Sequence, residues 1–333
     1  MANIKDVAKL AGVSISTVSR VVNNSASVAQ DKSDAVLRAM RELSYQPNTF
    51  AKSLVSNKSD TLGILVGNLC ESFFGQMMQG IEQIARQYNK QLIISAGHHN
   101  AAIEREAIQA LINRRCDALI LHAKALTDYQ LMELLELQPA SVLINRHIPD
   151  ISDQCIYLDN RHLGRQITEY LLENGHREIA AIMEAGSGFD CQERQQGYQD
   201  ALAACGIISD PKLIRQVPAT FTDAYKVTLQ LLDSKRPFTA IFVSQITMAT
   251  GVMKALRERK VQVPGDISVI AVGDQKQVQY HHPILSLGHY PILEMATQAT
   301  QLALSLCDSA LEKPPVIRFT SEIASGETVS QRV

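Results

Sequence analysis

The chain has 333 residues, of which 46% are hydrophobic and 20% charged, and its formal net charge is −2. These values are ordinary for a globular protein with a sizeable core, and the length is sufficient for two or three domains. They exclude a polycation that binds nucleic acid over its whole surface, because acidic and basic residues almost balance.

The sequence predicts neither a membrane protein nor a disulfide scaffold. No apolar run reaches the roughly 20 residues that a membrane-spanning helix needs. The N-terminal segment MANIKDVAKL has charges where a secretion signal would have its apolar stretch, so we expect a cytoplasmic protein with no membrane partner. The six cysteines are scattered without a Cys-x-x-Cys pair, which indicates buried free thiols and no zinc site.

Positive charge is concentrated at the N-terminus. Residues 1–60 contain eight Lys and Arg against five Asp and Glu, a net charge of +3, whereas the remainder of the chain has a net charge of −5. A basic segment joined to an acidic body favours a nucleic-acid contact confined to the N-terminus.

The N-terminal segment predicts three short helices. Asn3 is a suitable cap for the first, with Asp6 three positions later as in a capping box, and Gly12 ends that helix by adopting a left-handed backbone. Ser14 is a suitable cap for a second helix that runs to about Asn23. A third helix covers about residues 30–43. The expected buried residues are Val7, Ala8, Leu10 and Ala11 in the first helix, Val13 in the turn, Val18, Val21 and Val22 in the second helix, and Ala35, Val36, Ala39, Met40 and Leu43 in the third.

Two short helices joined by a glycine-containing turn form the helix-turn-helix unit that binds DNA. The second helix enters the major groove with its N-terminal residues toward the bases. On that face the sequence has Ile15, Ser16, Thr17, Ser19 and Arg20. Arginine bonds guanine through two donors and isoleucine packs on a thymine methyl group, so these residues are candidates for base contacts. The alternative is that the hydroxyls only cap and solvate a small helix.

A hinge is predicted after the third helix. Pro47 prevents that helix from continuing, and Asn48 is a suitable cap for one further helix that contains Ala51 and Leu54. A helix of about two turns is marginal alone in water, so we expect it to fold only against a partner helix or DNA. We therefore expect residues 1–46 to form a helix-turn-helix domain, 47–60 the hinge and a polar linker, and 61–333 a separate body.

From Thr61 onward, apolar runs alternate with helical stretches. The runs are LGILVG (62–67), QLIISA (91–96), ALILHA (118–123), SVLINR (141–146), EIAAIME (178–184), AIFVS (240–244) and SVIAVG (268–273). Helical patterns lie near 74–88, 102–114, 128–136, 162–174, 192–204, 222–232 and 247–259. This alternation predicts parallel sheets covered on both faces, and the number of strands favours two similar halves.

Motifs in both regions resemble one family. The string IKDVAKLAGVS-x-STVSRVVN, followed by Y-x-PN and A-x-SL, resembles the head of the lactose/galactose repressor family of bacterial transcriptional regulators. In the body, FFGQMMQGIEQIA, EREAIQALINRRCDALILHAKAL, LINR, ERQQGY and YPILEMATQATQLAL most resemble its galactose repressor and isorepressor branch. The resemblance implies a sequence-specific repressor of carbohydrate-utilisation genes and not an enzyme.

The resemblance also implies an architecture and partners. It implies an all-α helix-turn-helix head and an α/β body of two doubly wound parallel-sheet subdomains, like a periplasmic sugar-binding protein, with crossovers near residues 158, 290 and 321. A sugar-like effector then binds in the cleft at the carboxyl ends of the strands. A homodimer binds near-palindromic double-stranded operator DNA. Ile15, Ser16 and Arg20 take the base-reading positions, and Leu54 takes the place of a hinge leucine that wedges into the minor groove.

Sugar recognition needs polar groups for the hydroxyls and an aromatic face for the ring. By motif position in the family, the candidate effector-binding residues are Phe73, Phe74, Asn145, Arg194, Phe221, Gln245 and Asp274. Arg194 is the strongest candidate, because a planar cation bonds two hydroxyls or a carboxylate. Its alternative role is a surface salt bridge, and the alternative for the three phenylalanines is core packing.

The sequence departs from the family pattern at three places. Ala29 stands where a serine usually caps the third helix, which predicts a cost of about 1 kcal/mol. Gln245-Ile246 replaces the usual Asn-Asp before M-A-x-G, and Gly273-Asp274 replaces an Asp-Asp pair. A site built to bond a hydroxyl discriminates through such groups. The altered pocket predicts a phosphorylated, modified or less polar effector in place of plain galactose, or a regulator that has lost its effector response.

Other functions have less support. Adjacent histidines at 98–99 and 281–282 lack the spacing of metal ligands, so we predict no metal and no cofactor. No phosphate loop or G-x-S-x-G motif supports an enzyme. A transport solute-binding protein predicts an export signal and no helix-turn-helix, and an architectural DNA binder is favoured only by the altered pocket. No heptads follow residue 316, so a dimer is the expected assembly.

Overall fold

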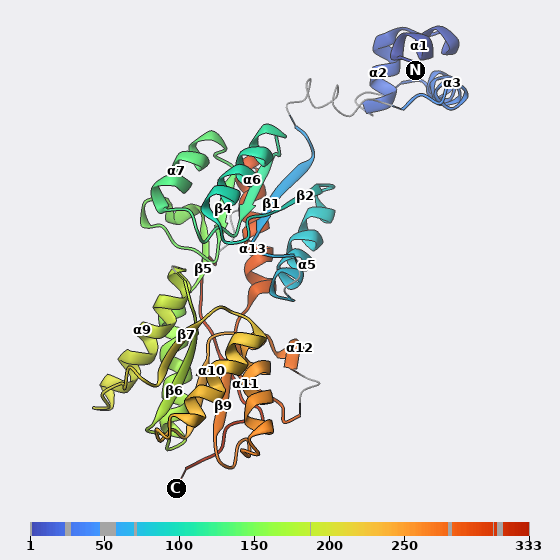
Figure 1. The fold of residues 1–333 in the computed structure, drawn as a ribbon. Coiled ribbons are helices and arrows are strands. Elements are labelled where there is room, and N and C mark those ends of the chain that lie inside the picture. Colours follow the sequence, from blue (N-terminus) through green and yellow to red (C-terminus); the bar gives the residue numbers. More distant parts are fainter. Residues whose placement is uncertain are drawn as a thin grey trace. The chain divides into compact units, whose positions relative to one another are not determined.

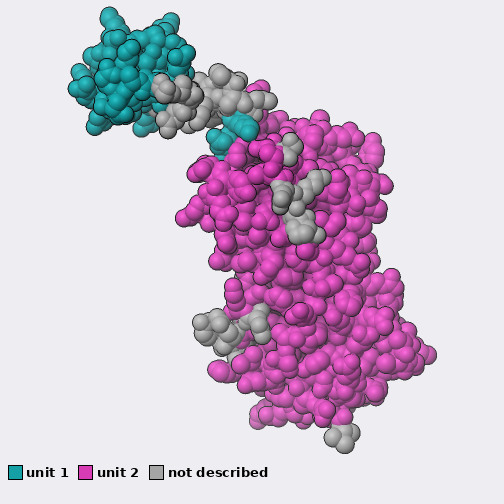
Figure 2. Space-filling model, turned by 180° about the vertical axis from the view of Figure 1, so that it is seen from behind, with its two compact units in different colours: residues 1–60 teal, residues 61–333 magenta. Residues whose placement is uncertain are grey.

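A computed structural model of the chain describes residues 2–23, 28–46, 58–69, 72–186, 188–278, 282–308, 310–311 and 316–332. The chain divides into two compact units, residues 1–60 and residues 61–333 (Figure 2). The predicted hinge helix, with Asn48 and Leu54, lies outside the described residues.

Unit 1 contains the three predicted helices, α1 (Ile4–Ala11), α2 (Ile15–Asn23) and α3 (Gln30–Glu42). The capping box is confirmed: Asn3 Oδ1 accepts from the Lys5 and Asp6 amides, and the Asp6 carboxylate accepts from the Asn3 amide at 2.9 Å. Gly12 ends α1 with φ of +63°, which is the left-handed conformation that glycine adopts without strain.

The core of unit 1 consists of small apolar residues from all three helices, namely Val7, Ala8, Val18, Val36 and Ala39. The prediction that Leu10 is buried is wrong, because its side chain is 46% exposed. The buried stripe of α1 follows positions 4, 7, 8 and 11, and position 10 lies outside that spacing. Because the core is so small, each helix of unit 1 can bury only one narrow stripe of side chains in it.

Unit 2 contains two six-stranded sheets (Figure 1). The first has the order β11-β5-β4-β3-β1-β2 and the second the order β12-β10-β9-β8-β6-β7. Neighbouring strands are parallel except for β10 and β12. The strands are β1 (Thr61–Val66), β2 (Gln91–Ala96), β3 (Ala118–Leu121), β4 (Ser141–Ile144), β5 (Cys155–Leu158), β6 (Ile179–Glu184), β7 (Ile214–Val217), β8 (Ala240–Val243), β9 (Ser268–Gly273), β10 (Ser286–His289), β11 (Arg318–Phe319) and β12 (Ile323–Ala324).

Helices cover both faces of each sheet, which confirms the predicted pair of doubly wound subdomains. The helices are α5 (Ser72–Gln87), α6 (Ala101–Asn113), α7 (Asp128–Leu137), α8 (Asn160–Glu173), α9 (Phe189–Ala204), α10 (Phe221–Asp233), α11 (Ile246–Glu258), α12 (Gln275–Val278) and α13 (Ile292–Cys307), with a 3-10 helix η1 at Pro149–Gln154. Side chains alternate across the second sheet. Ile179, Ala181 and Met183 of β6 pack with α8 and α9, whereas Ala180 and Ile182 pack with α10 and α11.

The chain passes between the two sheets at three places. It leaves the first sheet after β5, which ends at Leu158, and returns after β10, which ends at His289. It then crosses once more between β11 and β12. The crossing after β10 places α13 against α5 on the first sheet. Each subdomain is therefore built from segments that are distant in sequence (Figure 1).

Candidate functional site

The first candidate site is the solvent-facing side of α2 in unit 1. Val18 of this helix is fully buried, while Ile15 is 45% exposed and Ser16 and Arg20 are also exposed. Ser14 caps the helix: its Oγ accepts from the Thr17 amide at 3.1 Å and lies 2.8 Å from Thr17 Oγ1. Thr17 and Ser19 are half-buried. Ile15, Ser16 and Arg20 therefore form the outward part of the predicted set, and Thr17 takes part in the cap.

The second candidate site is a cavity of about 370 Å³ lined by both subdomains of unit 2. Its walls come from the carboxyl ends of the strands and from the segments that follow them, where open α/β sheets bind ligands. Six predicted residues line it, namely Phe73, Phe74, Asn145, Arg194, Gln245 and Asp274.

The prediction for Phe221 has no support in the cavity. Phe221 is not among the described residues that line it. Its ring stacks on Tyr225, with centroids 6.4 Å apart, and Lys254 Nζ lies 5.8 Å from the ring centroid. As the first residue of α10, Phe221 packs beside α11, and the preceding residue, Thr220, lines the cavity instead.

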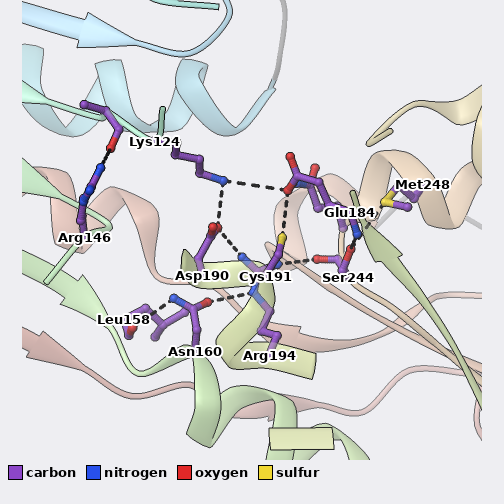
Figure 3. A network of polar contacts seen from close by, with 12 residues as sticks. Lys124, Arg146, Leu158, Asn160, Glu184, Asp190, Cys191, Arg194, Ser244 and Met248 are labelled. Atoms are coloured by element: carbon purple, nitrogen blue, oxygen red, sulfur yellow. Dashed lines mark hydrogen bonds and ion pairs between the residues drawn. The ribbon is translucent and has the colours of Figure 1, made fainter. Parts of the chain in front are cut away.

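Arg194 lines the cavity but its guanidinium is occupied by the protein. The residue is 3% exposed, so it is not a surface salt bridge. Its Nε donates to Asn160 Oδ1 at 2.8 Å, and its two terminal nitrogens donate to the Ser244 carbonyl at 2.7 Å and to Asp190 Oδ2 at 2.8 Å (Figure 3). Arg194 therefore ties α9 to the segments after β5 and β8.

A network of charged side chains crosses the cavity beside Arg194 (Figure 3). Lys124, which follows β3, places its Nζ 2.9 Å from Asp190 Oδ2 and 3.9 Å from Glu184 Oε2. Burial alone would lower the pKa of Lys124, but Asp190 and Glu184 together raise it. Burial alone would raise the pKa of Asp190, but Lys124 and Arg194 together lower it well below its usual value. Lys124 and Asp190 are therefore both charged near neutral pH.

A buried glutamate holds the loop that carries Lys124. Glu104, on α6, is 1% exposed. Its two carboxylate oxygens accept from the backbone amides of Lys124, Ala125 and Leu126 at 3.0 to 3.2 Å. Several amide donors on one carboxylate make a charge-assisted arrangement that fixes a loop firmly.

Aromatic rings form one wall of the cavity. The Phe73 ring makes edge contacts with Phe74, His122 and Tyr290, with centroids 5.1 to 5.6 Å apart. The His99 ring lies 6.1 Å from that of His122. Such edge-to-face clusters are rigid and offer apolar ring surface to a ligand.

The sequence reasoning missed several residues of the cavity wall, namely Gln76, His99, His122, Lys124, Glu184, Asp190 and Tyr290. One available signal was their position. His122 directly follows β3 and Lys124 lies two residues further on, Glu184 ends β6, and Tyr290 directly follows β10. The rule that ligands bind at the carboxyl ends of parallel strands therefore identifies them.

Two other kinds of site receive no support from the described part of the chain. It contains no cluster of three or more His, Cys, Asp or Glu side chains placed to hold a metal ion. Its helices are each too short or too polar to span a bilayer.

Comparisons with known proteins match both units. The family model "Bacterial regulatory proteins, lacI family" matches residues 3–48, and "Periplasmic binding protein-like domain" matches residues 168–329. The HTH-type transcriptional regulator GalR of Escherichia coli K12 is 41% identical over 309 residues, which are 93% of this chain and 90% of that protein. The resemblance noted in the sequence is thereby confirmed.

Two solved structures extend the comparison. A sugar-binding transcriptional regulator of the LacI family from Escherichia coli, complexed with phosphate, has a TM-score of 0.75 and 28% identity, covering 83% of this chain and 100% of that one. The lac repressor dimer bound to operator and the anti-inducer ONPF has a TM-score of 0.87 and 24% identity, covering 99% of both chains. Because the identity to the lac repressor is low, this second comparison shows a shared fold.

Proposed function

The chain belongs to the LacI family of bacterial regulatory proteins, and on that premise we propose that it represses carbohydrate-utilisation genes by binding operator DNA. Two identical subunits bind a near-palindromic double-stranded site, with one α2 helix in the major groove of each half-site. A sugar-like effector in the cavity of unit 2 controls that binding. Because the DNA target lies in the cytoplasm, we place the protein there.

The observation that carries the proposal is the outward face of α2. Val18 packs into the core of unit 1 while Ile15, Ser16 and Arg20 remain accessible from solvent. Arg20 supplies the bidentate donor that distinguishes guanine, Ser16 a hydroxyl for base edges, and Ile15 an apolar contact for thymine. The helix-turn-helix unit requires this division between a buried and a presented side.

The hinge completes the proposed interface with DNA. Asn48 caps a short helix over part of residues 47–60, and Leu54 inserts between base pairs in the minor groove at the operator centre. An apolar wedge of this kind unstacks one base step and bends the duplex. Residues 61–333 bind the effector and form the dimer, while residues 1–46 contact the major groove.

The cavity supports control by a small molecule. It lies between two subdomains joined by three chain segments, so a ligand that contacts both walls favours one subdomain arrangement over another. A differential affinity of about 1–3 kcal/mol changes operator affinity some 5- to 150-fold. The proposed contact set is Phe73, Phe74, Asn145, Arg194, Gln245 and Asp274.

Selection of bound duplexes from random DNA tests the first half of the proposal. The full-length protein should enrich one near-palindromic sequence. Arg20→Ala should lower the discrimination between that sequence and a scrambled duplex by about 1–3 kcal/mol, or some 5- to 150-fold. The matched control is Arg105→Ala, which removes an exposed arginine of unit 2. Retained discrimination in Arg20→Ala would contradict the proposed docking.

Titration of the selected duplex in the presence of sugars tests the second half. At least one sugar should shift the midpoint of DNA binding. A protein that selects DNA but shows no shift across a broad sugar panel has lost effector control, and the sensing part of the proposal is then wrong.

A further inference from the structure

Two ion pairs bridge the cavity of unit 2 away from the segments that cross between its sheets. Lys124 Nζ, on the side of the first sheet, lies 2.9 Å from Asp190 Oδ2 and 3.9 Å from Glu184 Oε2, both on the side of the second (Figure 3). The other ion pairs of the described residues lie within one subdomain or at a crossing segment. Away from the crossings, the cation that joins the two subdomains is therefore Lys124.

The first subdomain fixes the loop from which Lys124 reaches across the cavity. Glu104, which is 1% exposed on α6, accepts from the three backbone amides of residues 124–126. Gly97 leaves room for this side chain, because a Cβ there would lie 2.6 Å from Glu104 Cγ. A carboxylate that accepts several charge-assisted hydrogen bonds has little freedom to move. The loop therefore holds the backbone of Lys124 in one place.

On the second subdomain, both carboxylates have partners besides Lys124. Asp190 Oδ2 also accepts from Arg194 at 2.8 Å, and Glu184 Oε2 accepts from the Gln245 side-chain amide at 2.5 Å. Each carboxylate therefore keeps a hydrogen-bonded partner if Lys124 withdraws. Because an unsatisfied buried acceptor is what makes a broken contact expensive, this arrangement lowers the cost of separating the two walls.

The lysine also tolerates separation of the walls. Its side chain is 17% exposed, so its ammonium group gains water when the pair opens. When the pair closes, the loss of hydration of both charges offsets much of their attraction. The closed and open forms of such a contact are therefore close in free energy, as a reversible contact between two arrangements requires.

We propose that Lys124 is a latch, whose ion pairs with Asp190 and Glu184 hold the two subdomains in one arrangement independently of any ligand, and that Glu104 positions it. The inference rests on the proposed effector control and assigns a regulating contact to it. A ligand shifts operator binding only as far as it favours the latched arrangement over the unlatched one, or the reverse.

The distance between the two subdomains tests the latch directly. Nitroxide labels on Tyr129→Cys, in α7, and Ile208→Cys, after α9, report this distance, and both positions are exposed, at 68% and 94%. The full-length chain also carries Cys70→Ser, Cys205→Ser and Cys307→Ser, and the three remaining cysteines are buried. Dilution with unlabelled chains removes distances between subunits.

Pulsed dipolar spectroscopy should give one main distance in the otherwise unchanged protein, with a minor arrangement at about 0.1–10%. In Lys124→Met, at least about half of the chains should lie outside that distance. Lys124→Arg, which keeps the cation, should retain the main distance. The matched control is Lys90→Met, because Lys90 and Asp117 form a similarly buried pair of 2.8 Å within the first subdomain. An unchanged distribution in Lys124→Met, or equal broadening in Lys90→Met, would overturn the latch.

Glu104→Gln tests the positioning role without removing the cation. The amide has one acceptor oxygen in place of two, and its NH₂ group faces the backbone amides of residues 124–126. The distance distribution should broaden, although less than in Lys124→Met. Glu106→Gln, at an exposed position of the same helix, should leave it unchanged. If Glu104→Gln retains the distribution of the parent chain, Glu104 does not position the latch.

Operator titration separates this inference from the proposed function. Without any sugar, Lys124→Met should change the affinity for the selected duplex at least about fivefold. If the distance distribution broadens and operator affinity does not change, the latch holds the subdomains and the proposed coupling of the cavity to DNA is wrong. If neither changes, the latch is overturned, and DNA selection with the sugar titration decides the proposed function independently.

Discussion

Lys124 and Asp190 belong to different subdomains of unit 2, and their side chains meet in an ion pair of 2.9 Å inside the cavity. The lysine follows β3 of the first sheet and the aspartate lies in the first turn of α9 on the second. Asp190 also bonds Arg194, so one carboxylate is shared by two cations. The pair therefore links the two walls of the cavity.

Asp190→Asn tests the strength of this link. The substitution leaves Lys124 and Arg194 without their shared anion, and removing one partner of a buried pair typically costs about 3–5 kcal/mol. We expect the urea midpoint of unit 2 to fall accordingly. The matched control is Glu133→Gln, which breaks an exposed pair with Arg105 at 3.4 Å and should cost at most about 1 kcal/mol. Equal effects of the two variants would contradict a buried link.

His122 predicts a dependence of stability on pH. Its pKa is about 3 in the folded protein and about 6.5 when unfolded, so the unfolded chain binds the proton first as pH falls. The stabilising contribution is complete above about pH 6.5 and is lost as pH falls from there toward about 3. Each pH unit in that window costs about 1.4 kcal/mol.

Comparison of the wild type with His122→Phe isolates this contribution. Urea unfolding at about pH 7.5 and about pH 5.5 should show the wild type losing about 1.4 kcal/mol more than the variant. Other groups that titrate, including the buried His176, contribute equally to both proteins. Between about pH 7.5 and 8.5 the two should not diverge, because His122 is neutral in both states there. Parallel pH profiles below pH 6.5 would contradict a buried neutral histidine.

The helices of unit 1 could be predicted from the sequence because the residues that start and end them lie close together in the chain. The capping box of Asn3 and Asp6, the left-handed Gly12 and the uncapped start of α3 all depend on residues within a few positions of one another. The prediction that Leu10 is buried failed because helical periodicity alone does not show how wide a stripe of α1 a small core covers. Most inner strands of unit 2, among them β1, β3, β6 and β8, were equally visible, since buried parallel strands are continuous apolar runs.

Other features depend on contacts between distant segments. Strand β7 has the sequence IRQV and β10 the sequence SLGH, and neither is an apolar run, so pattern reasoning missed both. The partners Lys124 and Asp190 are 66 positions apart, and only the packed fold brings them together. Family motifs placed six effector candidates at the cavity, but the side-chain direction of Phe221 at the start of α10 could not be read from sequence.

Gly164 on α8 predicts a sharp limit on the packing of α9. A Cβ at this position would lie 2.1 Å from the Arg194 carbonyl oxygen, and one at Gly197 would lie 2.0 Å from the Arg161 carbonyl oxygen. The two helices therefore touch through their backbones. Gly164→Ala must push α9 away, and overpacking of this kind costs about 1–3 kcal/mol. Because α9 carries Arg194 and Asp190, the variant should also weaken binding of any cavity ligand.

Gly75 on α5 provides the matched control. A Cβ at Gly75 meets no atom within 4 Å, so alanine adds no clash there. Gly75→Ala should raise stability by up to about 1 kcal/mol, as expected for an exposed helical position. Thermal unfolding of both variants measures the contrast. A lower melting temperature in both, or in neither, would contradict the backbone contact inferred between α8 and α9.

Ala29 predicts that unit 1 can be stabilised by one hydroxyl group. It precedes α3 with φ of −53° and ψ of 139°, an extended conformation suited to a cap, yet its side chain makes no cap hydrogen bond. The amides of Lys32 and Ser33 donate to the Ala29 carbonyl at 3.0 Å. A serine at position 29 would offer a side-chain acceptor to the first turn, and such a cap contributes about 1 kcal/mol.

Hydrogen exchange in the full-length protein measures this gain, because it reports on α3 separately from unit 2. In Ala29→Ser, amides in the first turns of α3 should exchange about fivefold more slowly, the equivalent of about 1 kcal/mol. Ala203→Ser, at an exposed position of α9, should leave α3 unchanged. If Ala29→Ser does not slow exchange in α3, the prediction is wrong. The small core of unit 1, and not the missing cap, then limits the stability of this unit.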